Sequence, residues 1–151
     1  MTLKPLTQRQ WPQLHQMMLA EGFPHTPQSF NKASGFLEDC ICFGIFGGND
    51  TLEAAIVLGE VTKESAFVDA VCLKKRRGRW LKPQLLRCFF KMVFEQMGLR
   101  YLWAEPHSKQ AYQLLGKLGF VWVTGVEQHK NKPPCFVLTQ GCYQQSKFKR
   151  G

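Results

Sequence analysis

Short apolar runs of strand length alternate with amphipathic helical segments along this sequence of 151 residues. Such an order excludes a pure helical bundle and an all-strand sandwich, because both periodicities are interleaved along one chain. The turn Gly47-Gly48-Asn49-Asp50 joins two of the runs, and its residues accept the positive φ that a hairpin requires. The predicted strands are Leu3–Leu6, Cys40–Phe46, Leu52–Gly59, Ala66–Leu73, Tyr101–Ala104, Phe120–Val126 and Cys135–Thr139.

Four helices are predicted between these strands, two of them with clear start and stop residues. Pro83 suits the first position of a helix because its missing N–H has no helical partner there, and Gly98 stops that helix. Ser108 is a suitable N-cap for the next helix, which Gly119 closes. The order β-α-α-β-β-β-α-β-α-β-β predicts one mixed α/β domain. The helices are predicted over residues 8–21, 27–38, 83–97 and 108–118.

The composition permits a packed core and gives a basic protein. Hydrophobic residues make up 44% of the chain, which excludes wholesale disorder. The 20 Lys and Arg against 11 Asp and Glu give a net charge of +9. This surplus favours a polyanionic partner, which is nucleic acid, a phosphate-bearing cofactor or an acidic protein surface. No apolar run approaches the ~18 residues of a membrane-spanning helix, so no membrane partner is expected.

The cysteine and histidine residues predict neither disulfides nor a metal site. The six Cys include no C-x-x-C pair, and the four His are scattered, whereas zinc sites usually show paired ligand spacing. The first ten residues contain no apolar segment of the kind that begins a signal peptide. We therefore expect a cytoplasmic protein in a reducing compartment, without a bound metal.

Two segments resemble motifs of the GNAT superfamily of N-acetyltransferases, in the family's order and separation. Phe67–Phe94 is similar to the family's fourth strand, pyrophosphate loop and third helix, and Ala104–Phe120 ends in the familiar KLGF. The resemblance implies a GNAT-like α/β (α+β) fold, with a mixed central sheet of six to seven strands flanked by about four helices. We expect a single GNAT-like domain over residues 1–143 and a basic, flexible tail over residues 144–151. The resemblance also implies acetyl transfer from acetyl-CoA to an amine-bearing small molecule or protein.

The resemblance places coenzyme A at the end of the fourth strand and in the loop after it. A loop that leads into a helix N-terminus offers backbone N–H groups to a pyrophosphate, and the strand would lend an N–H to the thioester carbonyl. The family pattern R/Q-x-x-G-x-G/A begins here at Arg77, but Trp80 and Lys82 stand where small residues are usual. The predicted cofactor-binding residues are Val71, Cys72, Leu73, Arg77, Gly78, Arg79, Trp80, Leu81, Lys82 and Ser108.

An amine acceptor requires a general base, and the thiolate leaving group of coenzyme A requires an acid. Glu60, Asp69, Glu105 and His107 are candidate bases, of which Glu105 and His107 are favoured because they follow the end of a strand. In the pattern LYEKLGF the family often has a Tyr that protonates the leaving thiolate, and here Tyr112 lies one turn before that position. The predicted catalytic residues are Glu105, His107 and Tyr112.

The departures from the family pattern leave a second hypothesis open. Trp80, Lys82, Ser108 and Leu115 differ from it at both cofactor and acid positions. A small internal virion protein of short-tailed bacteriophages resembles this chain in its similarly altered loop. The alternative is thus a non-catalytic GNAT-fold binding or structural protein, packaged in a virion. It would contact nucleic acid or an assembly partner through Lys74, Lys75, Arg76, Arg77 and Arg79.

Overall fold

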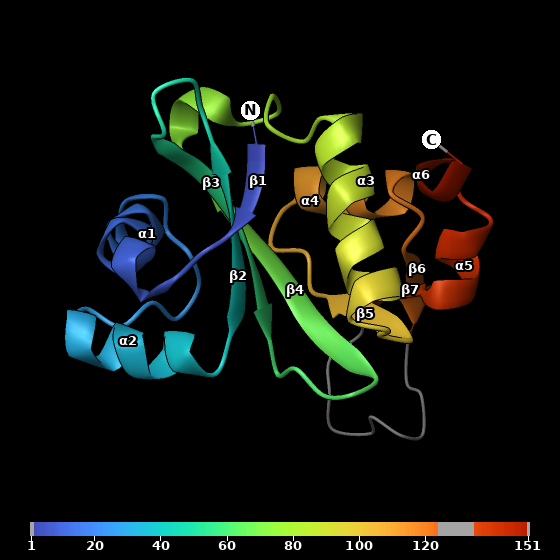
Figure 1. Cartoon of the computed structure of the whole chain (residues 1–151), viewed down its shortest axis with the longest axis horizontal. Helices are drawn as coiled ribbons and strands as arrows, with labels where there is room; N and C mark the ends of the chain where they lie inside the picture. Colours follow the sequence, from blue (N-terminus) through green and yellow to red (C-terminus); the bar gives the residue numbers. More distant parts are fainter. Residues whose placement is uncertain (1, 124–134, 151) are drawn as a thin grey trace.

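The computed structural model describes residues 2–123 and 135–150, which form one mixed sheet with helices on both faces (Figure 1). The sheet has seven strands in the order β1-β2-β3-β4-β5-β7-β6. Neighbouring strands are antiparallel except β4 and β5, which are parallel. The predicted fold class and the sheet of six to seven strands are therefore confirmed. The strands are β1 (Thr2–Pro5), β2 (Ile41–Phe46), β3 (Leu52–Gly59), β4 (Ser65–Cys72), β5 (Tyr101–Ala104), β6 (Val121–Val123) and β7 (Cys135–Thr139).

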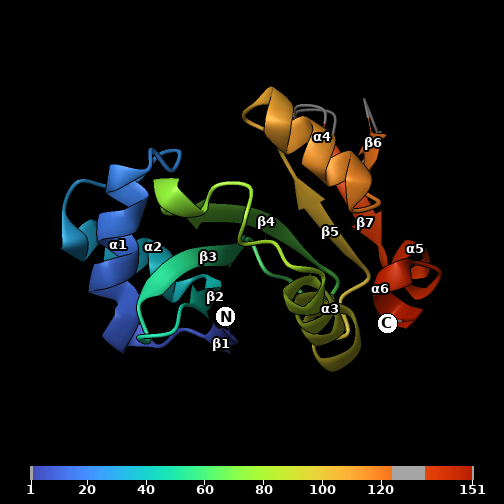
Figure 2. The same cartoon turned by 90° about the horizontal axis from the view of Figure 1, so that it is seen from above.

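The helices begin where the sequence supplies capping residues. Ser29 accepts a hydrogen bond from the backbone N–H at the start of α2, and Ser108 does the same for α4. Pro83 occupies the first turn of α3, which a π-helical turn extends from Met92 to Gln96. Figure 2 shows α1 and α2 on one side of the sheet and α3 on the other. The helices are α1 (Trp11–Ala20), α2 (Phe30–Glu38), α3 (Pro83–Lys91), α4 (Lys109–Lys117), α5 (Gln140–Gln144) and α6 (Lys147–Arg150).

Each face of the sheet has its own apolar core, because successive residues of a strand point to opposite faces. On one face, Leu14 of α1 and Leu37 of α2 belong to the cluster that contains Val57 of β3. On the other face, Ile56 of β3 belongs to the cluster that contains Phe90 of α3. The central strands are thus buried on both sides, which fixes the positions of their ends and of the loops that follow.

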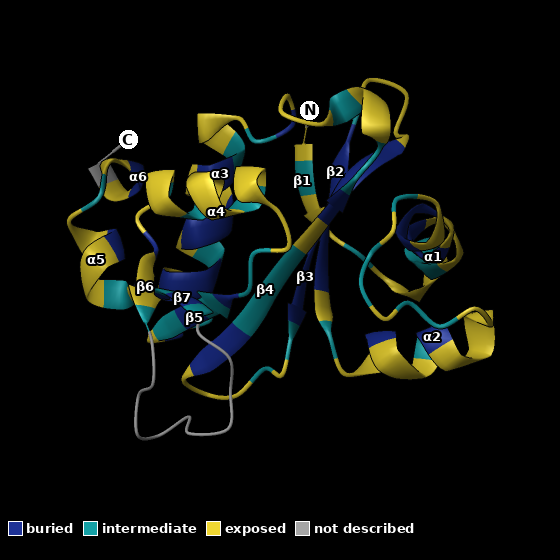
Figure 3. Cartoon of the chain, turned by 180° about the vertical axis from the view of Figure 1, so that it is seen from behind, coloured by how far each residue is buried: buried dark blue, intermediate teal, exposed yellow. Residues whose placement is uncertain are grey.

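Strands β4 and β5 pair only near their beginnings. Residues 65–67 pair with residues 101–103, and among the described residues this pairing ends there although β4 continues to Cys72. On its other edge, β4 stays paired with β3 as far as Cys72. Ser65 and Ala66 at the start of β4 are buried, residues 67–69 are intermediate and Ala70 is exposed, before Val71 is buried again (Figure 3). The two strands therefore part, and the second half of β4 presents a free edge to the space between them.

The C-terminal segment corrects one expectation from the sequence. Residues 144–151 are expected from the sequence to form a flexible tail, but in the described part Gln144 ends α5 and Lys147–Arg150 form α6. Phe148 is 7% exposed, and its ring lies 5.2 Å from that of Phe90 in α3. Tyr143 is buried and stacks on Phe94 at 5.0 Å. Two aromatic anchors in an otherwise polar segment thus order it against α3.

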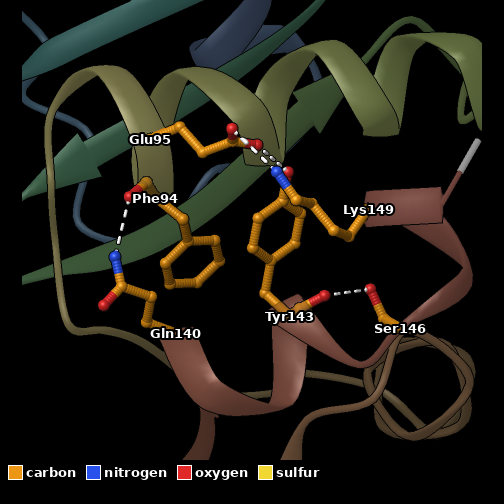
Figure 4. A network of polar contacts seen from close by, with 6 residues as sticks. All are labelled: Phe94, Glu95, Gln140, Tyr143, Ser146 and Lys149. Atoms are coloured by element: carbon orange, nitrogen blue, oxygen red, sulfur yellow. Dashed lines mark hydrogen bonds and ion pairs between the residues drawn. The ribbon is translucent and has the colours of Figure 1, made fainter.

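Polar contacts around Glu95 reinforce this packing (Figure 4). The Tyr143 hydroxyl donates a hydrogen bond of 2.5 Å to Glu95 Oε2, and Lys149 Nζ lies 3.0 Å from Oε1. The Tyr143 and Lys149 hydrogen bonds lower the pKa of Glu95, while burial and the Glu95 carboxylate raise the pKa of Tyr143 to about 12. Gln140 adds a hydrogen bond to the Phe94 carbonyl at 2.9 Å.

Two further observations concern the described part of the chain. None of its helices has both the length and the apolar character needed to cross a membrane. Within the same residues, no three His, Cys, Asp or Glu side chains gather as metal ligands, and the six cysteines form no disulfide.

Replacing Phe148 tests whether the end of the chain belongs to the core. We expect Phe148→Ala to lower the free energy of unfolding by about 3 kcal/mol, because it removes a buried ring from the surface of α3. Urea unfolding measures this loss, and Lys147→Ala, an exposed neighbour, is the control that should change stability little. Equal stability of Phe148→Ala and the unmodified chain would show that the segment is not packed.

Candidate functional site

A cavity of about 340 Å³ lies where β4 and β5 part. The free edge of β4, the inner face of α3 and the apolar side of α4 form its walls, and the segment after β5 closes one end. Its lining is mostly apolar and aromatic, as is common for sites that bind small organic ligands. The apolar lining includes Val68, Val71, Trp80, Leu81, Leu86, Phe89, Phe90, Leu114, Leu115 and Leu118.

The free edge of β4 directs backbone donors into this cavity. The Leu73 N–H donates to the Glu53 carbonyl of β3 at 2.9 Å. Because N–H groups alternate between the two edges of a strand, those of Cys72 and Ala70 point away from β3 and toward the gap. The Asp69 side chain accepts the Ala70 N–H at 2.8 Å. The Cys72 N–H thus faces the cavity and can donate to the carbonyl oxygen of a ligand.

A second cavity, of about 690 Å³, shares part of its lining with the first. Residues 23–27, between α1 and α2, form one wall, and the ends of α2 and β3 form another. Asp69, Glu105 and His107 line both cavities. These three titratable side chains therefore lie at the junction of the two spaces.

Asp69 and His107 are close enough to influence each other. His107 Nε2 lies 3.8 Å from Asp69 Oδ2, and the Asp69 side chain is largely buried whereas that of His107 is half exposed. Burial raises the pKa of Asp69, although the Ala70 N–H bond and His107 lower it, and the Glu105 charge adds to the rise. A histidine beside a desolvated carboxylate is a typical arrangement for proton transfer.

The second cavity is acidic in a basic protein. Four carboxylates line it, those of Asp39, Glu60, Asp69 and Glu105, and none of its described lining residues is Lys or Arg. The whole chain has a net charge of +9. A cavity lined by one sign of charge concentrates ligands of the opposite sign, so this cavity favours a cation.

Two internal carboxylates hold the basic loop between β4 and α3. Arg76 Nε lies 2.8 Å from Glu53 Oε2, and its Nη2 donates to Oε1 at 3.1 Å; the Glu53 side chain is 6% exposed. Arg77 Nη2 lies 3.2 Å from Glu21 Oε2, and the Lys74 N–H donates to Glu21 Oε1 at 3.3 Å. The sequence presents this run as one cationic surface for nucleic acid or an assembly partner. In the structure, Arg76 and Arg77 are instead held in ion pairs with the chain itself.

The backbone of this loop is also occupied by internal hydrogen bonds. The N–H groups of Arg76, Arg77 and Arg79 donate to carbonyls of residues 73, 74 and 76, at 2.8 to 3.3 Å. The Lys82 N–H donates to the Trp80 carbonyl at 3.0 Å, and Pro83 has no N–H. Trp80 is buried in the apolar cluster that contains Phe90 of α3. The loop is therefore a closed turn that uses most of its own donors.

The structure gathers only part of the predicted site. Leu73 packs toward the opposite core, while Gly78, Arg79 and Lys82 lie in the loop outside the cavity lining. Ser108 caps α4 by accepting the Ala111 N–H at 3.0 Å. The predicted residues that line the first cavity are Val71, Cys72, Arg77, Trp80, Leu81, Glu105 and His107.

Tyr112 lies outside the lining of both cavities. Its side chain is 49% exposed, and its ring lies 5.0 Å from Phe136 and 5.7 Å from Trp122. Asp69, weighed in the sequence but set aside because it lies within a strand, stands instead at the junction. The available signal was a carboxylate in an otherwise apolar strand. Glu21 and Asp39 follow helices without a motif, so the sequence offered no signal for them.

Comparison with known proteins gives the fold. No protein-family model matches the sequence, and no curated protein matches it by sequence. The spermidine N-acetyltransferase SpeG from Vibrio cholerae, in complex with CoA and spermine, matches with a TM-score of 0.74 at 16% identity, over 95% of this chain and 98% of that chain. Its dodecameric structure in an intermediate state matches with a TM-score of 0.75 at 15% identity, over 95% and 96% of the two chains. The chain has the GNAT fold.

The GNAT fold implies coenzyme A, and the residues of this site fit one end of that molecule. The apolar first cavity and the Cys72 N–H suit an acyl group on a pantetheine arm. The pyrophosphate end fits poorly, because Trp80 replaces the first small residue of the GNAT pattern and the N–H groups of Arg76, Arg77, Arg79 and Lys82 already donate to carbonyls of the loop. Glu21 adds a carboxylate beside Arg77, where an anionic ligand would approach the loop.

The ion pair between Arg76 and Glu53 should contribute strongly to stability. We expect Arg76→Met to lower the free energy of unfolding by about 3 kcal/mol, because it leaves the buried Glu53 carboxylate without its partner. Lys75→Met, an exposed neighbour in the same loop, is the matched control and should stay within about 0.5 kcal/mol of the unmodified chain. Equal unfolding midpoints for the two variants would contradict the role of the ion pair.

Proposed function

We propose that this chain transfers an acetyl group from acetyl-CoA to an amine. One observation carries the proposal: the apolar first cavity and the acidic second cavity meet at Asp69, Glu105 and His107. The shared fold with spermidine N-acetyltransferases, one of them in complex with CoA and spermine, supports it. The first cavity is assigned to the thioester donor and the second cavity to the amine acceptor.

On the donor side, the carbon–sulfur bond of the thioester breaks as the amine nitrogen bonds to the acetyl carbon, and the thiolate leaves with a proton returned by the His107 imidazolium. The Cys72 N–H, at the edge of β4, is positioned to donate to the thioester carbonyl oxygen and to stabilise negative charge that develops there. The apolar walls from α3 and α4 exclude water, which strengthens such a hydrogen bond.

On the acceptor side, the junction residues accept a proton. An amine is positively charged at neutral pH and attacks a carbonyl only after it loses a proton. His107 is the proposed proton acceptor, and Asp69 positions it and stabilises the imidazolium that forms. Glu105 adds negative charge that holds the ammonium group at the junction.

The acidic lining of the second cavity supports a positively charged acceptor. Asp39 and Glu60 lie in the same lining as the junction residues and add two carboxylates. An acceptor with one amine at the junction and a second positive charge near Asp39 would be attracted to both. Spermidine and spermine are therefore suitable first probes.

One observation favours the alternative of a non-catalytic binding or structural protein. The loop that would hold the pyrophosphate is closed by internal hydrogen bonds and by the ion pair between Arg77 and Glu21. A GNAT-fold chain that no longer binds coenzyme A would not need free backbone N–H groups in this loop. This alternative predicts that neither acetyl-CoA nor coenzyme A stabilises the protein against heat, whereas the enzyme proposal predicts a rise in Tm.

Replacement of the junction residues tests the mechanism. We expect His107→Gln and Asp69→Asn each to lower kcat for spermidine acetylation by about 100-fold with little change in KM. Tyr112→Phe is the matched control and should retain activity, because Tyr112 lies outside both cavities. A large loss in Tyr112→Phe, together with an active His107→Gln, would contradict this assignment of the acid–base groups.

The pH dependence of the reaction gives an independent test. Because burial raises the pKa of Asp69, its carboxylate takes up a proton at a higher pH than an ordinary aspartate as the pH falls. Protonation removes the charge that supports His107, so kcat should decline below that raised pKa. The acid limb of the pH profile should change shape in Asp69→Asn, and an unchanged limb would exclude Asp69 from the reaction.

The role of charge in the acceptor cavity is tested at a distance from the reacting groups. We expect Asp39→Asn to raise the KM for spermidine by about fivefold, since a lost partly screened charge contact is worth about 1 kcal/mol. The control, Asp50→Asn, removes an exposed carboxylate near β1 and should leave KM unchanged. Equal KM values for the two variants would contradict a cation in this cavity.

A further inference from the structure

Glu21 holds the contacts that the loop after β4 would otherwise offer to a phosphate. One oxygen of its carboxylate accepts the Lys74 N–H at 3.3 Å, and the other lies 3.2 Å from Arg77 Nη2. Glu21 and Arg77 both line the first cavity, and the Glu21 side chain is 14% exposed. A backbone N–H together with a guanidinium is a typical set of donors for a phosphate oxygen. Here the Glu21 carboxylate of the chain itself binds these two donors.

Other backbone donors of the loop are also used within the chain. Its turn uses the N–H groups of Arg76, Arg77 and Arg79 for bonds to its own carbonyls. Trp80 is buried below the loop, so the backbone cannot close around a ligand without displacing an indole from the core. By contrast, the cavity beyond the loop is open along β4 and apolar, which suits a pantetheine arm.

We infer that the first cavity recognises the acylated pantetheine arm of its donor and gains no affinity from the pyrophosphate and nucleotide beyond that arm. This inference rests on the proposed function and names its donor class as an acyl thioester of pantetheine. Glu21 is the residue that excludes the pyrophosphate, through its own charge and through the donors that it occupies.

The balance of charges supports this assignment. A phosphate in the place of Glu21 would leave a largely buried carboxylate without either of its partners, and an unpartnered buried charge is unfavourable. The two anions would also repel each other at short range. Lys75, Arg79 and Lys82 are exposed, so their attraction for phosphates is screened at physiological salt.

Calorimetric titration of the whole chain with coenzyme A and with pantetheine tests the inference without relying on turnover. At 0.15 M salt we expect the two dissociation constants to agree within about threefold. A cradle with two or three charge-assisted hydrogen bonds to the pyrophosphate would favour coenzyme A by about 100-fold or more. A preference of that size would overturn the inference while leaving the proposed function intact.

Removing the charge of Glu21 should open the loop to phosphate. We expect Glu21→Gln to tighten coenzyme A binding by about tenfold and to leave pantetheine binding unchanged, because Arg77 loses its anionic partner. Glu64→Gln is the matched control, since Glu64 forms an exposed ion pair with Arg100 and should affect neither ligand. Unchanged coenzyme A binding in a folded Glu21→Gln variant would overturn the role of Glu21.

A second variant keeps the test decisive if Glu21→Gln does not fold. Arg77→Gln should change coenzyme A affinity by less than about threefold, because the Arg77 guanidinium is already paired with the Glu21 carboxylate. A loss of tenfold or more would show that Arg77 holds the pyrophosphate and would overturn the inference. Failure of both coenzyme A and pantetheine to bind the unmodified chain would instead overturn the proposed function, and the inference with it.

Discussion

Parallel pairing between β4 and β5 extends over only three residue pairs, and the arrangement of the site follows from that short contact. Antiparallel partners hold both strands on their outer edges, with β3 beside β4 and β7 beside β5, so each strand is paired on the side away from the gap. Backbone donors that a continuous sheet would use in its ladder instead face a cavity covered by α3 and α4. The opening is therefore part of the sheet itself and does not depend on a mobile loop.

The charges of the chain are separated by location. Carboxylates are few, yet Glu21 and Glu53 hold the loop after β4, and others gather in the second cavity. Most of the basic surplus is left on the outside, with two arginines of the loop neutralised from within. A net charge of +9 thus gives a poor description of the two cavities, because one lining is mainly apolar and the other contains four carboxylates.

Local residue preferences made most of the fold predictable from the sequence. Pro83 and Ser108 begin their helices, and Asp50 takes the positive φ of the hairpin turn, so the elements they bound lie close to where the sequence places them. The place of Glu105 and His107 in the cavity linings was predictable for a similar reason, since residues after a strand end commonly face a cavity. Asp69 and Glu21 come together with the site only through tertiary packing. Phe148 lies in a polar segment without apolar periodicity, so its burial was not visible in the sequence.

The position of Glu21 ties two parts of the molecule together mechanically. It follows the last residue of α1 and directly precedes residues 22–27, most of which form a wall of the second cavity. Its contacts with Arg77 and Lys74 fasten that wall to the loop at the mouth of the first cavity. A displacement of the loop would carry the wall with it. In the proposed function these are the donor and acceptor spaces, and Glu21 connects the loop beside one to the wall of the other.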